Sequence, residues 1–215
     1  MHIIDVNTDI VEINNKIAIR NRKHLEEHRV YGFNIMGAVG SGKTIMIERL
    51  IEKLGDEFKI GVIAGDVVSD MDVKRIERLG VPVIGVNTGT ECHLDAHLIE
   101  HAICKLPLDD LDILLIENVG NLICPVDFEL GAHKKIVVVS ATEGDDTVEK
   151  HPMIFVYADI CAINKIDIAD AVDADVEKMF DDAKRINPEL DIIRTSFKTG
   201  EGVDELVWWV KRYVI

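Results

Sequence analysis

A glycine-rich segment that ends in lysine and threonine carries the strongest chemical signal in this sequence. Residues 37–44 fit the pattern G-x-x-x-x-G-K-[ST]. Glycines allow consecutive backbone N–H groups to turn inward around a phosphate, a lysine reaches the β- and γ-phosphates, and a threonine hydroxyl binds Mg²⁺. The segment therefore predicts a phosphate-binding loop made of Gly37, Ala38, Val39, Gly40, Ser41, Gly42, Lys43 and Thr44.

A second motif indicates which base accompanies those phosphates. Asn164, Lys165 and Asp167 fit N-K-x-D. An aspartate can accept hydrogen bonds from N1–H and the 2-amino group of guanine, whereas adenine offers neither donor. A downstream loop of Ser196, Phe197 and Lys198 is placed to support the base. Each of these segments alone could be a simple turn or helix cap. Their occurrence together, in this order, predicts GTP or GDP as the ligand.

Acidic residues provide candidates for Mg²⁺ binding and for activation of water. Glu117 and Gly120 have the acid-x-x-Gly form that senses Mg²⁺ and the γ-phosphate in GTPases, but Asn121 follows where a water-orienting glutamine would stand. We therefore expect slow intrinsic turnover, with Lys43 and Glu117 in the catalytic site. On the loop of residues 65–72, Asp66 is the favoured group for water activation, with Asp70 or Asp72 near Mg²⁺; one of these three acids is expected only to cap the next helix.

Adjacent thiol and imidazole groups predict a second kind of metal site. Cys92 and His93 stand at a loop-to-helix junction, and Cys124 follows Glu117 on the next segment of loop. Such ligands suit Zn²⁺ or Ni²⁺ rather than Mg²⁺. Three protein ligands leave a tetrahedral metal incomplete, so the fourth is expected to be His97, water or a residue of a second subunit. Because Cys124 extends from the segment that senses the γ-phosphate, metal affinity and nucleotide state should be linked.

The two remaining cysteines are expected to be small buried hydrophobic residues. Cys104 lies in an apolar helical segment and Cys161 in an apolar strand. Four scattered cysteines do not make a disulfide framework in a chain of this size.

The elements that must position these residues alternate regularly along the chain. Apolar runs predict strands at 31–36, 58–64, 81–86, 112–116, 135–140, 159–163 and 191–196. Helical spacing predicts helices at 45–54, 73–79, 94–106, 171–186 and 203–213. Strands that are apolar on both faces and alternate with helices indicate an α/β fold with a mostly parallel sheet of about seven strands and helices on both faces. Ligands of such sheets bind at the carboxyl ends of the strands, where all the motif loops should meet.

Length and composition set limits on the class of protein. The chain has 215 residues, of which 47% are hydrophobic and 29% charged, and we expect one domain over 1–215 with an amphipathic helix in 7–30 packed on it. A formal charge of −15 argues against nucleic acid or an acidic membrane as a partner. Residues 1–6 show no secretion signal and no run is long enough for a membrane span, so a cytoplasmic protein is expected.

Several of these segments together resemble a known family. GDVVSDMD, TGTECHLDA, IENVGNLICP, SATEGDDTVEKHP and NKID, with the phosphate-binding loop, are similar to the HypB family of hydrogenase-maturation GTPases, which belong to the SIMIBI class of P-loop proteins. The resemblance covers residues 31–170. It implies a P-loop GTPase domain that helps insert nickel into [NiFe]-hydrogenase.

The resemblance also implies roles for individual residues and partners. Cys92, His93 and Cys124 match the metal site of the family, GTP drives homodimerisation, and the metal lies near the dimer interface. Lys150 is implied to reach the nucleotide of the other subunit. The implied partners are the hydrogenase large subunit and a companion nickel-binding maturation protein. The Cys-x-x-Cys-Gly-Cys motif and histidine-rich stretch of many members do not occur in this sequence.

Three other functions remain open from the sequence. A urease-accessory GTPase would deliver nickel by similar logic, although that family has a Cys-Pro-His metal loop. A P-loop kinase with a structural zinc would leave N-K-x-D without a role. A pure GTP-binding switch would use the cysteine and histidine only for packing, or only for a structural zinc.

Overall fold

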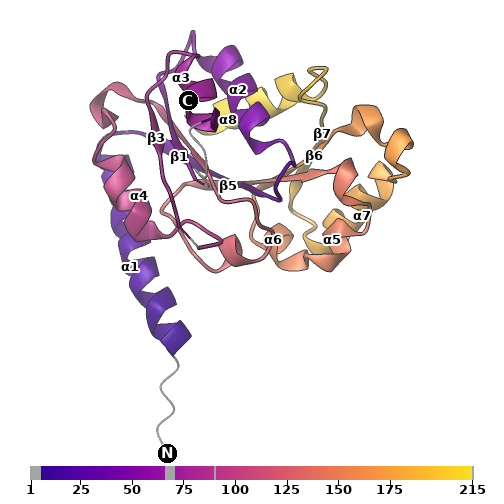
Figure 1. Cartoon of the computed structure of the whole chain (residues 1–215), viewed down its shortest axis with the longest axis horizontal. Coiled ribbons are helices and arrows are strands. Elements are labelled where there is room, and N and C mark those ends of the chain that lie inside the picture. The colour runs from indigo at the N-terminus through magenta and orange to yellow at the C-terminus, as the bar shows by residue number, and fades with distance from the viewer. Residues whose placement is uncertain (1–5, 66–70, 90, 215) are drawn as a thin grey trace, which may run out of the picture.

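The computed structural model describes residues 6–65, 71–89 and 91–214 as a parallel β-sheet covered by helices on both faces (Figure 1). The sheet has the strand order β3-β2-β4-β1-β5-β6-β7, and every neighbouring pair is parallel. The strands are β1 (Tyr31–Gly37), β2 (Ile60–Ala64), β3 (Val83–Gly85), β4 (Ile113–Glu117), β5 (Lys134–Ser140), β6 (Ile160–Asn164) and β7 (Asp191–Arg194). The α/β fold, the seven strands and their parallel arrangement are therefore confirmed.

The α-helices are α1 (Val6–Glu27), α2 (Lys43–Leu54), α3 (Met71–Glu77), α4 (Ala96–Ile103), α5 (Thr147–Lys150), α6 (Pro152–Val156), α7 (Val176–Ile186) and α8 (Val203–Val214). Short 3-10 turns are η1 (Leu108–Asp110), η2 (Cys124–Val126), η3 (Ala141–Glu143), η4 (Ile166–Ile168) and η5 (Asp170–Val172). The sequence pattern did not predict α5 and α6, which are too short to show a helical period. It also began α7 too early, because 3-10 turns and the cap of Asp175 precede that helix.

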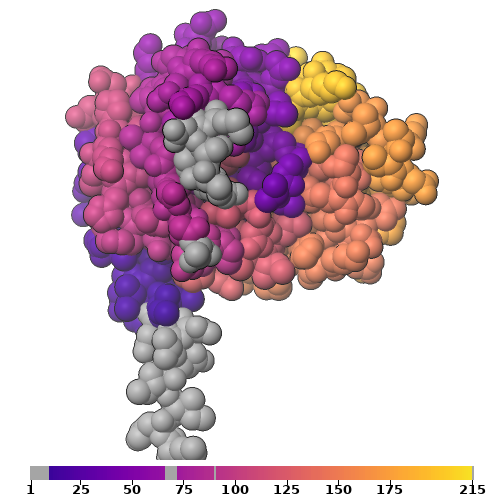
Figure 2. Space-filling view, viewed as in Figure 1, coloured from indigo at the N-terminus to yellow at the C-terminus, as the bar shows by residue number. Residues whose placement is uncertain are grey.

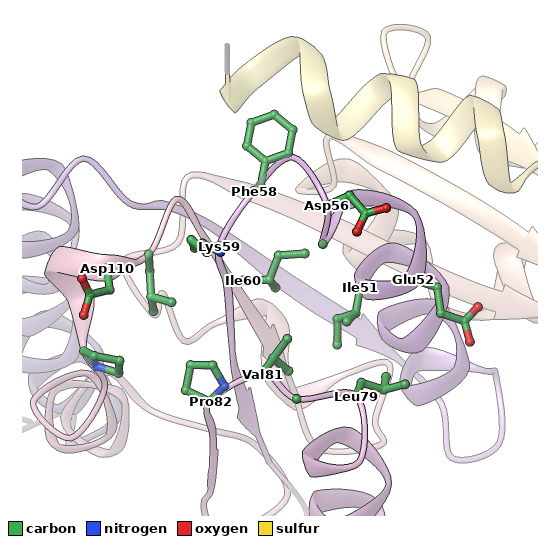
Figure 3. A pocket seen from close by; sticks show the side chains of 14 residues that line it. Ile51, Glu52, Asp56, Phe58, Lys59, Ile60, Leu79, Val81, Pro82 and Asp110 are labelled. Atoms are coloured by element: carbon green, nitrogen blue, oxygen red, sulfur yellow. The ribbon is translucent and has the colours of Figure 1, made fainter.

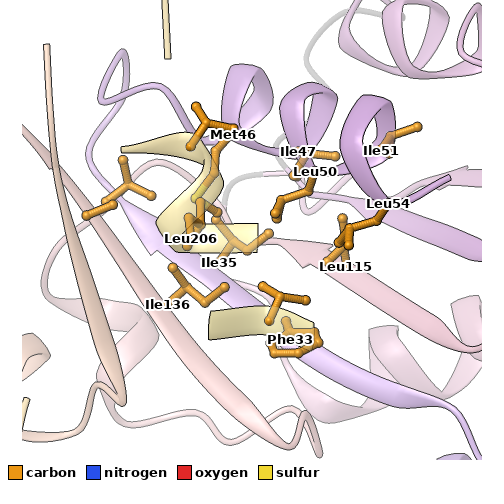
Figure 4. Close-up of a cluster of buried hydrophobic side chains, with 14 of the residues drawn as sticks. Phe33, Ile35, Met46, Ile47, Leu50, Ile51, Leu54, Leu115, Ile136 and Leu206 are labelled. Atoms are coloured by element: carbon orange, nitrogen blue, oxygen red, sulfur yellow. The ribbon is translucent and has the colours of Figure 1, made fainter. Parts of the chain in front are cut away.

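Successive side chains along each strand point to opposite faces of the sheet, so the core has one layer on each face. On one face, Phe33 and Ile35 of β1 pack with Met46, Ile47 and Leu50 of α2 (Figure 4). Helices α3 and α8 cover the same face. The opposite face is covered by α1 and α4 at the β2–β4 side and by α5, α6 and α7 at the β5–β6 side.

Helix α1 is anchored to α4 and extends beyond the body of the molecule, as the ribbon and space-filling views both show (Figures 1 and 2). Leu25, near the carboxyl end of α1, is fully buried, whereas Ile10 and Ile13, closer to its amino end, are 48% and 58% exposed. None of the helices in the described ranges is long and apolar enough to cross a bilayer.

Candidate functional site

The phosphate-binding loop joins the carboxyl end of β1 to the start of α2. Lys43 is only 7% exposed, and its Nζ donates hydrogen bonds to the carbonyl oxygens of Gly37 at 3.1 Å and Ala38 at 3.0 Å. The side chain thus folds back over the loop. The hydroxyl of Ser41 is buried without a partner. A lysine across the loop and an unpaired hydroxyl inside it fit a phosphate group.

The shape of this loop depends on glycine. Gly42 has φ of 112°, which L side chains rarely adopt, and a Cβ there would lie 2.3 Å from Nδ2 of Asn164. The backbone and the close approach therefore both require glycine at this position. A cavity of about 230 Å³ opens beside the loop, lined by Val39, Gly40, Gly42, Lys43, Thr44, Ile45, Gly65, Asp72, Arg75, Glu117 and Asn118.

Glu117 lies at the carboxyl end of β4, beside this cavity. Its Oε1 accepts a hydrogen bond from Thr44 Oγ1 at 2.7 Å, while its Oε2 is buried without a partner. Burial raises the pKa of Glu117 to about 7, although the hydrogen bond from Thr44 and the charge of Lys43 act in the opposite direction. A hydroxyl, a carboxylate and an unpaired buried oxygen fit a divalent cation with oxygen ligands, as Mg²⁺ requires.

The other predicted acids follow β2. Asp72 lies in the first turn of α3 and is exposed; it lines the same cavity, and its Oδ1 lies 3.5 Å from Nη1 of Arg75. Asp66 and Asp70 lie outside the described residues. Arg75 also makes a two-point ion pair with Glu48 of α2, with N–O distances of 3.0 and 2.8 Å. Arg75 is a site residue that the sequence pattern did not indicate, because a charged residue in a short helix has no distinctive spacing.

Asn164 ties the three nucleotide motifs together. Its Nδ2 donates to the carbonyl oxygen of Ser41 at 2.8 Å, and its Oδ1 accepts from the backbone N–H of Phe197 at 3.1 Å. The residue is 2% exposed. One buried amide therefore fixes the phosphate-binding loop against both loops expected at the base.

The remaining residues of those two loops divide into exposed and structural groups. Asp167 and Lys198 face solvent, where a base can reach them. Lys165 Nζ donates to Thr142 Oγ1 at 3.0 Å. Phe197 is 1% exposed and belongs to the α2–α8 core, so its ring packs beneath the loop. Ser196 is fully buried and its Oγ accepts the backbone N–H of Thr199 at 3.2 Å.

The segment after β4 packs directly on the phosphate-binding loop. The backbone N–H of Asn121 donates to the carbonyl oxygen of Gly37 at 3.1 Å. A Cβ on Gly120 would lie 2.4 Å from Cγ2 of Val39 and 3.0 Å from its backbone nitrogen. Glycine is therefore needed for the close approach. Because the two segments are in contact, a displacement of residues 38–40 must also displace residues 118–121.

The two predicted thiol ligands lie in contact. Cys92 is exposed and Cys124, in the first position of η2, is partly exposed. A hydrogen bond between their side chains raises the pKa of Cys92. His93 Nδ1 is 3.7 Å from Cys92 Sγ, and the imidazole stacks on Phe128 with ring centroids 3.9 Å apart. The structure therefore brings together two soft ligands, with a third beside them.

His97 points elsewhere. Its Nε2 is 3.3 Å from Nε2 of His101 on the next turn of α4, and its Nδ1 is 3.9 Å from Glu100. In residues 6–65, 71–89 and 91–214, no group of three or more His, Cys, Asp and Glu side chains is arranged to hold a metal ion. The Cys92, His93 and Cys124 set is present as a thiol pair with an adjacent imidazole.

For Cys161 the structure agrees with the prediction from the sequence, whereas for Cys104 it does not. Cys161 is fully buried in β6, as predicted. The prediction of a buried Cys104 is wrong: this residue caps the carboxyl end of α4 and is exposed, because the helix ends before the apolar run does. Lys150 pairs with Asp146 of the same chain at 2.6 Å and remains exposed.

A larger hollow lies at the opposite edge of the sheet, where β2 begins (Figure 3). It measures about 540 Å³, and its apolar lining includes Ile51, Ile60 and Leu79. None of the residues of the nucleotide or thiol motifs lines it. This hollow is therefore separate from the described residues of the nucleotide and thiol motifs.

The sequence is similar to a known protein family and to individual proteins of known function. Residues 32–194 match the family described as CobW/HypB/UreG, nucleotide-binding domain. The probable hydrogenase maturation factor HypB of Methanocaldococcus jannaschii is 55% identical over 212 residues, covering 99% of this chain and 96% of that protein. HypB of Escherichia coli K12 is 41% identical over 97% of this chain and 72% of its own length.

Two crystal structures agree with these matches. HypB from Archaeoglobus fulgidus has a TM-score of 0.91 and 53% identity, covering 95% of this chain and all of that one. HypB from Helicobacter pylori, solved in complex with nickel, has a TM-score of 0.88 and 34% identity over 94% of each chain. Sequence identity and coverage this high show membership of the same family, and not only a shared fold. The chain therefore belongs to the HypB family of hydrogenase maturation factors.

Proposed function

We propose that this chain is a GTPase whose nucleotide state is coupled to the binding of nickel or zinc, and that it assists nickel insertion into [NiFe]-hydrogenase. The observation that carries the proposal is the position of the thiol pair. Glu117 contacts Thr44 of the phosphate-binding loop, and Cys124, on the same loop, contacts Cys92. A short stretch of chain thus joins the phosphate end of the nucleotide site to the candidate metal site.

The nucleotide site supports a guanine nucleotide with Mg²⁺. Thr44 and Glu117 would hold the cation, with Asp72 at the rim of the same cavity. The cation would neutralise charge on the β- and γ-phosphates, and Lys43 would contact the same phosphates. Asp167 would accept the hydrogen bonds of guanine, supported by the loop of Ser196 and Lys198.

Slow hydrolysis is part of this proposal. Asn121 is bound through its backbone to Gly37, and its side-chain amide donates to the carbonyl oxygen of Cys92 at 3.4 Å. It thus occupies the position of a water-orienting glutamine while facing the thiol pair. We assign water activation to Asp66 and an outer position near Mg²⁺ to Asp70.

Nickel or zinc is the proposed cargo of the thiol pair. Thiolates bind Zn²⁺ and Ni²⁺ well, and exposed ligands permit both loading and release. His93 is the proposed third ligand. The imidazole of His97, water or a side chain of a second copy would complete the coordination, which supports a GTP-dependent homodimer with the metal near its interface.

The proposed partners follow from that cargo. A hydrogenase large subunit would receive the nickel, and a companion nickel-binding maturation protein would supply it. Lys150 would reach the nucleotide of the second subunit, which requires the ion pair with Asp146 to open. The related protein of Helicobacter pylori is named a hydrogenase/urease maturation factor at 37% identity, so delivery to a urease is the second candidate function.

A metal titration tests the central claim. Ni²⁺ and Zn²⁺ are titrated into the wild-type chain, Cys92→Ser, Cys124→Ser and the control Cys104→Ser, with GDP or a non-hydrolysable GTP analogue bound. We expect the first two substitutions to weaken binding by at least tenfold and Cys104→Ser to leave it unchanged, since Cys104 lies at the far end of α4. Release of phosphate from GTP is measured in parallel. Unchanged metal affinity in Cys92→Ser would exclude the chaperone function.

A further inference from the structure

Asn118 connects the end of β4 to the loop that carries Cys92 and His93. Its Oδ1 accepts two backbone N–H groups, from Leu94 at 3.1 Å and from Val119 at 2.9 Å. Its Nδ2 donates to Oδ1 of Asn34 in β1 at 3.2 Å. The residue follows Glu117 directly and is fully buried. One side chain therefore touches β1, the segment after β4 and the residue that follows His93.

We propose that Asn118 is the positioning residue that transmits nucleotide state to the thiol pair. This inference rests on the proposed function. Movement of Glu117 toward a cation must displace the side chain of Asn118, because the two residues are consecutive. The backbone N–H of Asn118 donates to the carbonyl oxygen of Ile35 at 2.9 Å, so β1 is the fixed point about which this displacement occurs. The Oδ1 contact then shifts the N–H of Leu94, and with it the backbone of His93 and Cys92.

Burial makes this contact stronger than two other links between the segments, which are at least partly open to solvent. One is the side-chain hydrogen bond between Cys92 and Cys124. The other is the hydrogen bond from Asn121 Nδ2 to the carbonyl oxygen of Cys92, which at 3.4 Å is exposed and near the distance limit. The Asn118 contact lies in the interior, where Leu94 is also fully buried. A buried N–H that loses its acceptor finds no water to replace it, so the two segments must move together.

The start of α4 offers a matched control. Asn14 of α1 is also buried, and its Oδ1 accepts the backbone N–H of Ala96 at 2.8 Å, while its Nδ2 donates to the carbonyl oxygen of Glu129. It binds a backbone N–H two residues beyond the one that Asn118 binds. The two hydrogen bonds of Asn14 lead to Ala96 and Glu129 rather than to residues 117–121, so the loss of Asn14 should loosen the loop without uncoupling it.

The experiment measures the ratio of Ni²⁺ dissociation constants of the full chain with GDP and with a non-hydrolysable GTP analogue. In the wild type we expect this ratio to differ from one by roughly 5- to 150-fold. Asn118→Leu removes all three hydrogen bonds and should bring the ratio close to one. Asn14→Leu should retain the wild-type ratio. By linkage, Ni²⁺ should change the affinity for the GTP analogue by the same factor.

The outcomes separate this inference from the proposed function. A wild-type ratio of one would overturn the coupling in the proposed function. A wild-type ratio far from one that persists in Asn118→Leu, or is lost equally in Asn14→Leu, would overturn the role of Asn118 alone. If Asn118→Leu does not fold, hydrogen exchange in the wild type decides: the Leu94 and Val119 amides should change protection together between the two nucleotides, and an unchanged Leu94 amide would contradict the inference.

Discussion

The hydroxyl of Thr44 donates a 2.7 Å hydrogen bond to the carboxylate of Glu117, which joins the first turn of α2 to the carboxyl end of β4. The second oxygen of the same carboxylate is buried and unpaired. A cation bound between these two residues would replace the hydrogen bond and satisfy that oxygen. The contact therefore places β4, and the loop that leads to Cys124, under the influence of the nucleotide.

Mg²⁺ binding should depend on pH through Glu117. Burial raises the pKa of Glu117 to about 7, and the cation binds only the ionised carboxylate. Affinity for Mg²⁺ in the GDP complex should therefore rise as pH increases from 6 to 8, by at most about tenfold per unit below 7. Magnesium titrations at three pH values measure this. Glu117→Gln should bind Mg²⁺ weakly with a flat pH profile, and an equally steep profile in that variant would contradict the assignment.

Gly120→Ala should weaken nucleotide binding. The added methyl group would collide with Val39 and push residues 38–40 out of position. Overpacking typically costs about 1–3 kcal/mol, which corresponds to roughly 5- to 150-fold in affinity if the strain falls on the loop. Fluorescent GDP binding provides the measurement. Gly80→Ala is the control, since Gly80 has open space around it and its φ of 77° adds only backbone strain; similar losses of nucleotide affinity in both variants would argue against a specific contact.

Asp167→Asn should change the base preference. Asparagine presents an amide donor where the carboxylate accepted the 2-amino group, so guanine loses its partner and xanthine, with an oxygen at that position, gains one. We expect GTP affinity to fall by at least tenfold and XTP affinity to rise. Competition binding with both nucleotides tests this. Asp170→Asn, at a nearby exposed acid, should leave the preference unchanged.

Glu143→Gln should alter how stability responds to pH. Both carboxylate oxygens of Glu143 are buried with no side-chain partner in the described part of the chain, and burial raises the pKa of Glu143 to about 7. An acid with a raised pKa stabilises the fold below its unfolded value of 4.5 and loses that contribution as pH rises through 7.

The stability of the wild type relative to Glu143→Gln should therefore fall between pH 4.5 and 8, by at most about 3 kcal/mol. Thermal melts at several pH values measure the difference between the two proteins. Glu149→Gln, an exposed acid on α5, serves as the reference and should show no such trend. A constant difference across this range would show that the buried carboxylate is not proton-linked.

Local patterns were sufficient for the fold class and for the nucleotide motifs. Residues 37–44 and 164–167 form their loops from contiguous residues, and the apolar runs between helices predicted the parallel sheet. Element ends were less predictable. The strand expected at 81–86 is shorter in the structure, where β3 spans Val83–Gly85, and the helix expected to continue to 106 ends before Cys104. Hydrogen-bond partners and caps determine where an element ends, even where the apolar pattern continues.

The sequence by itself determined which chemical groups this protein carries and that parallel strands bring their loops to one edge. Only the tertiary structure decided which of those groups touch. Asn164 meets Ser41 across 123 positions, Asn118 meets Leu94 across 24, and His97 turns to His101 instead of the thiol pair. The physical reason is that a buried side-chain hydrogen bond depends on the packed distance between two elements, and that distance is set by the whole core rather than by the spacing of residues along the chain.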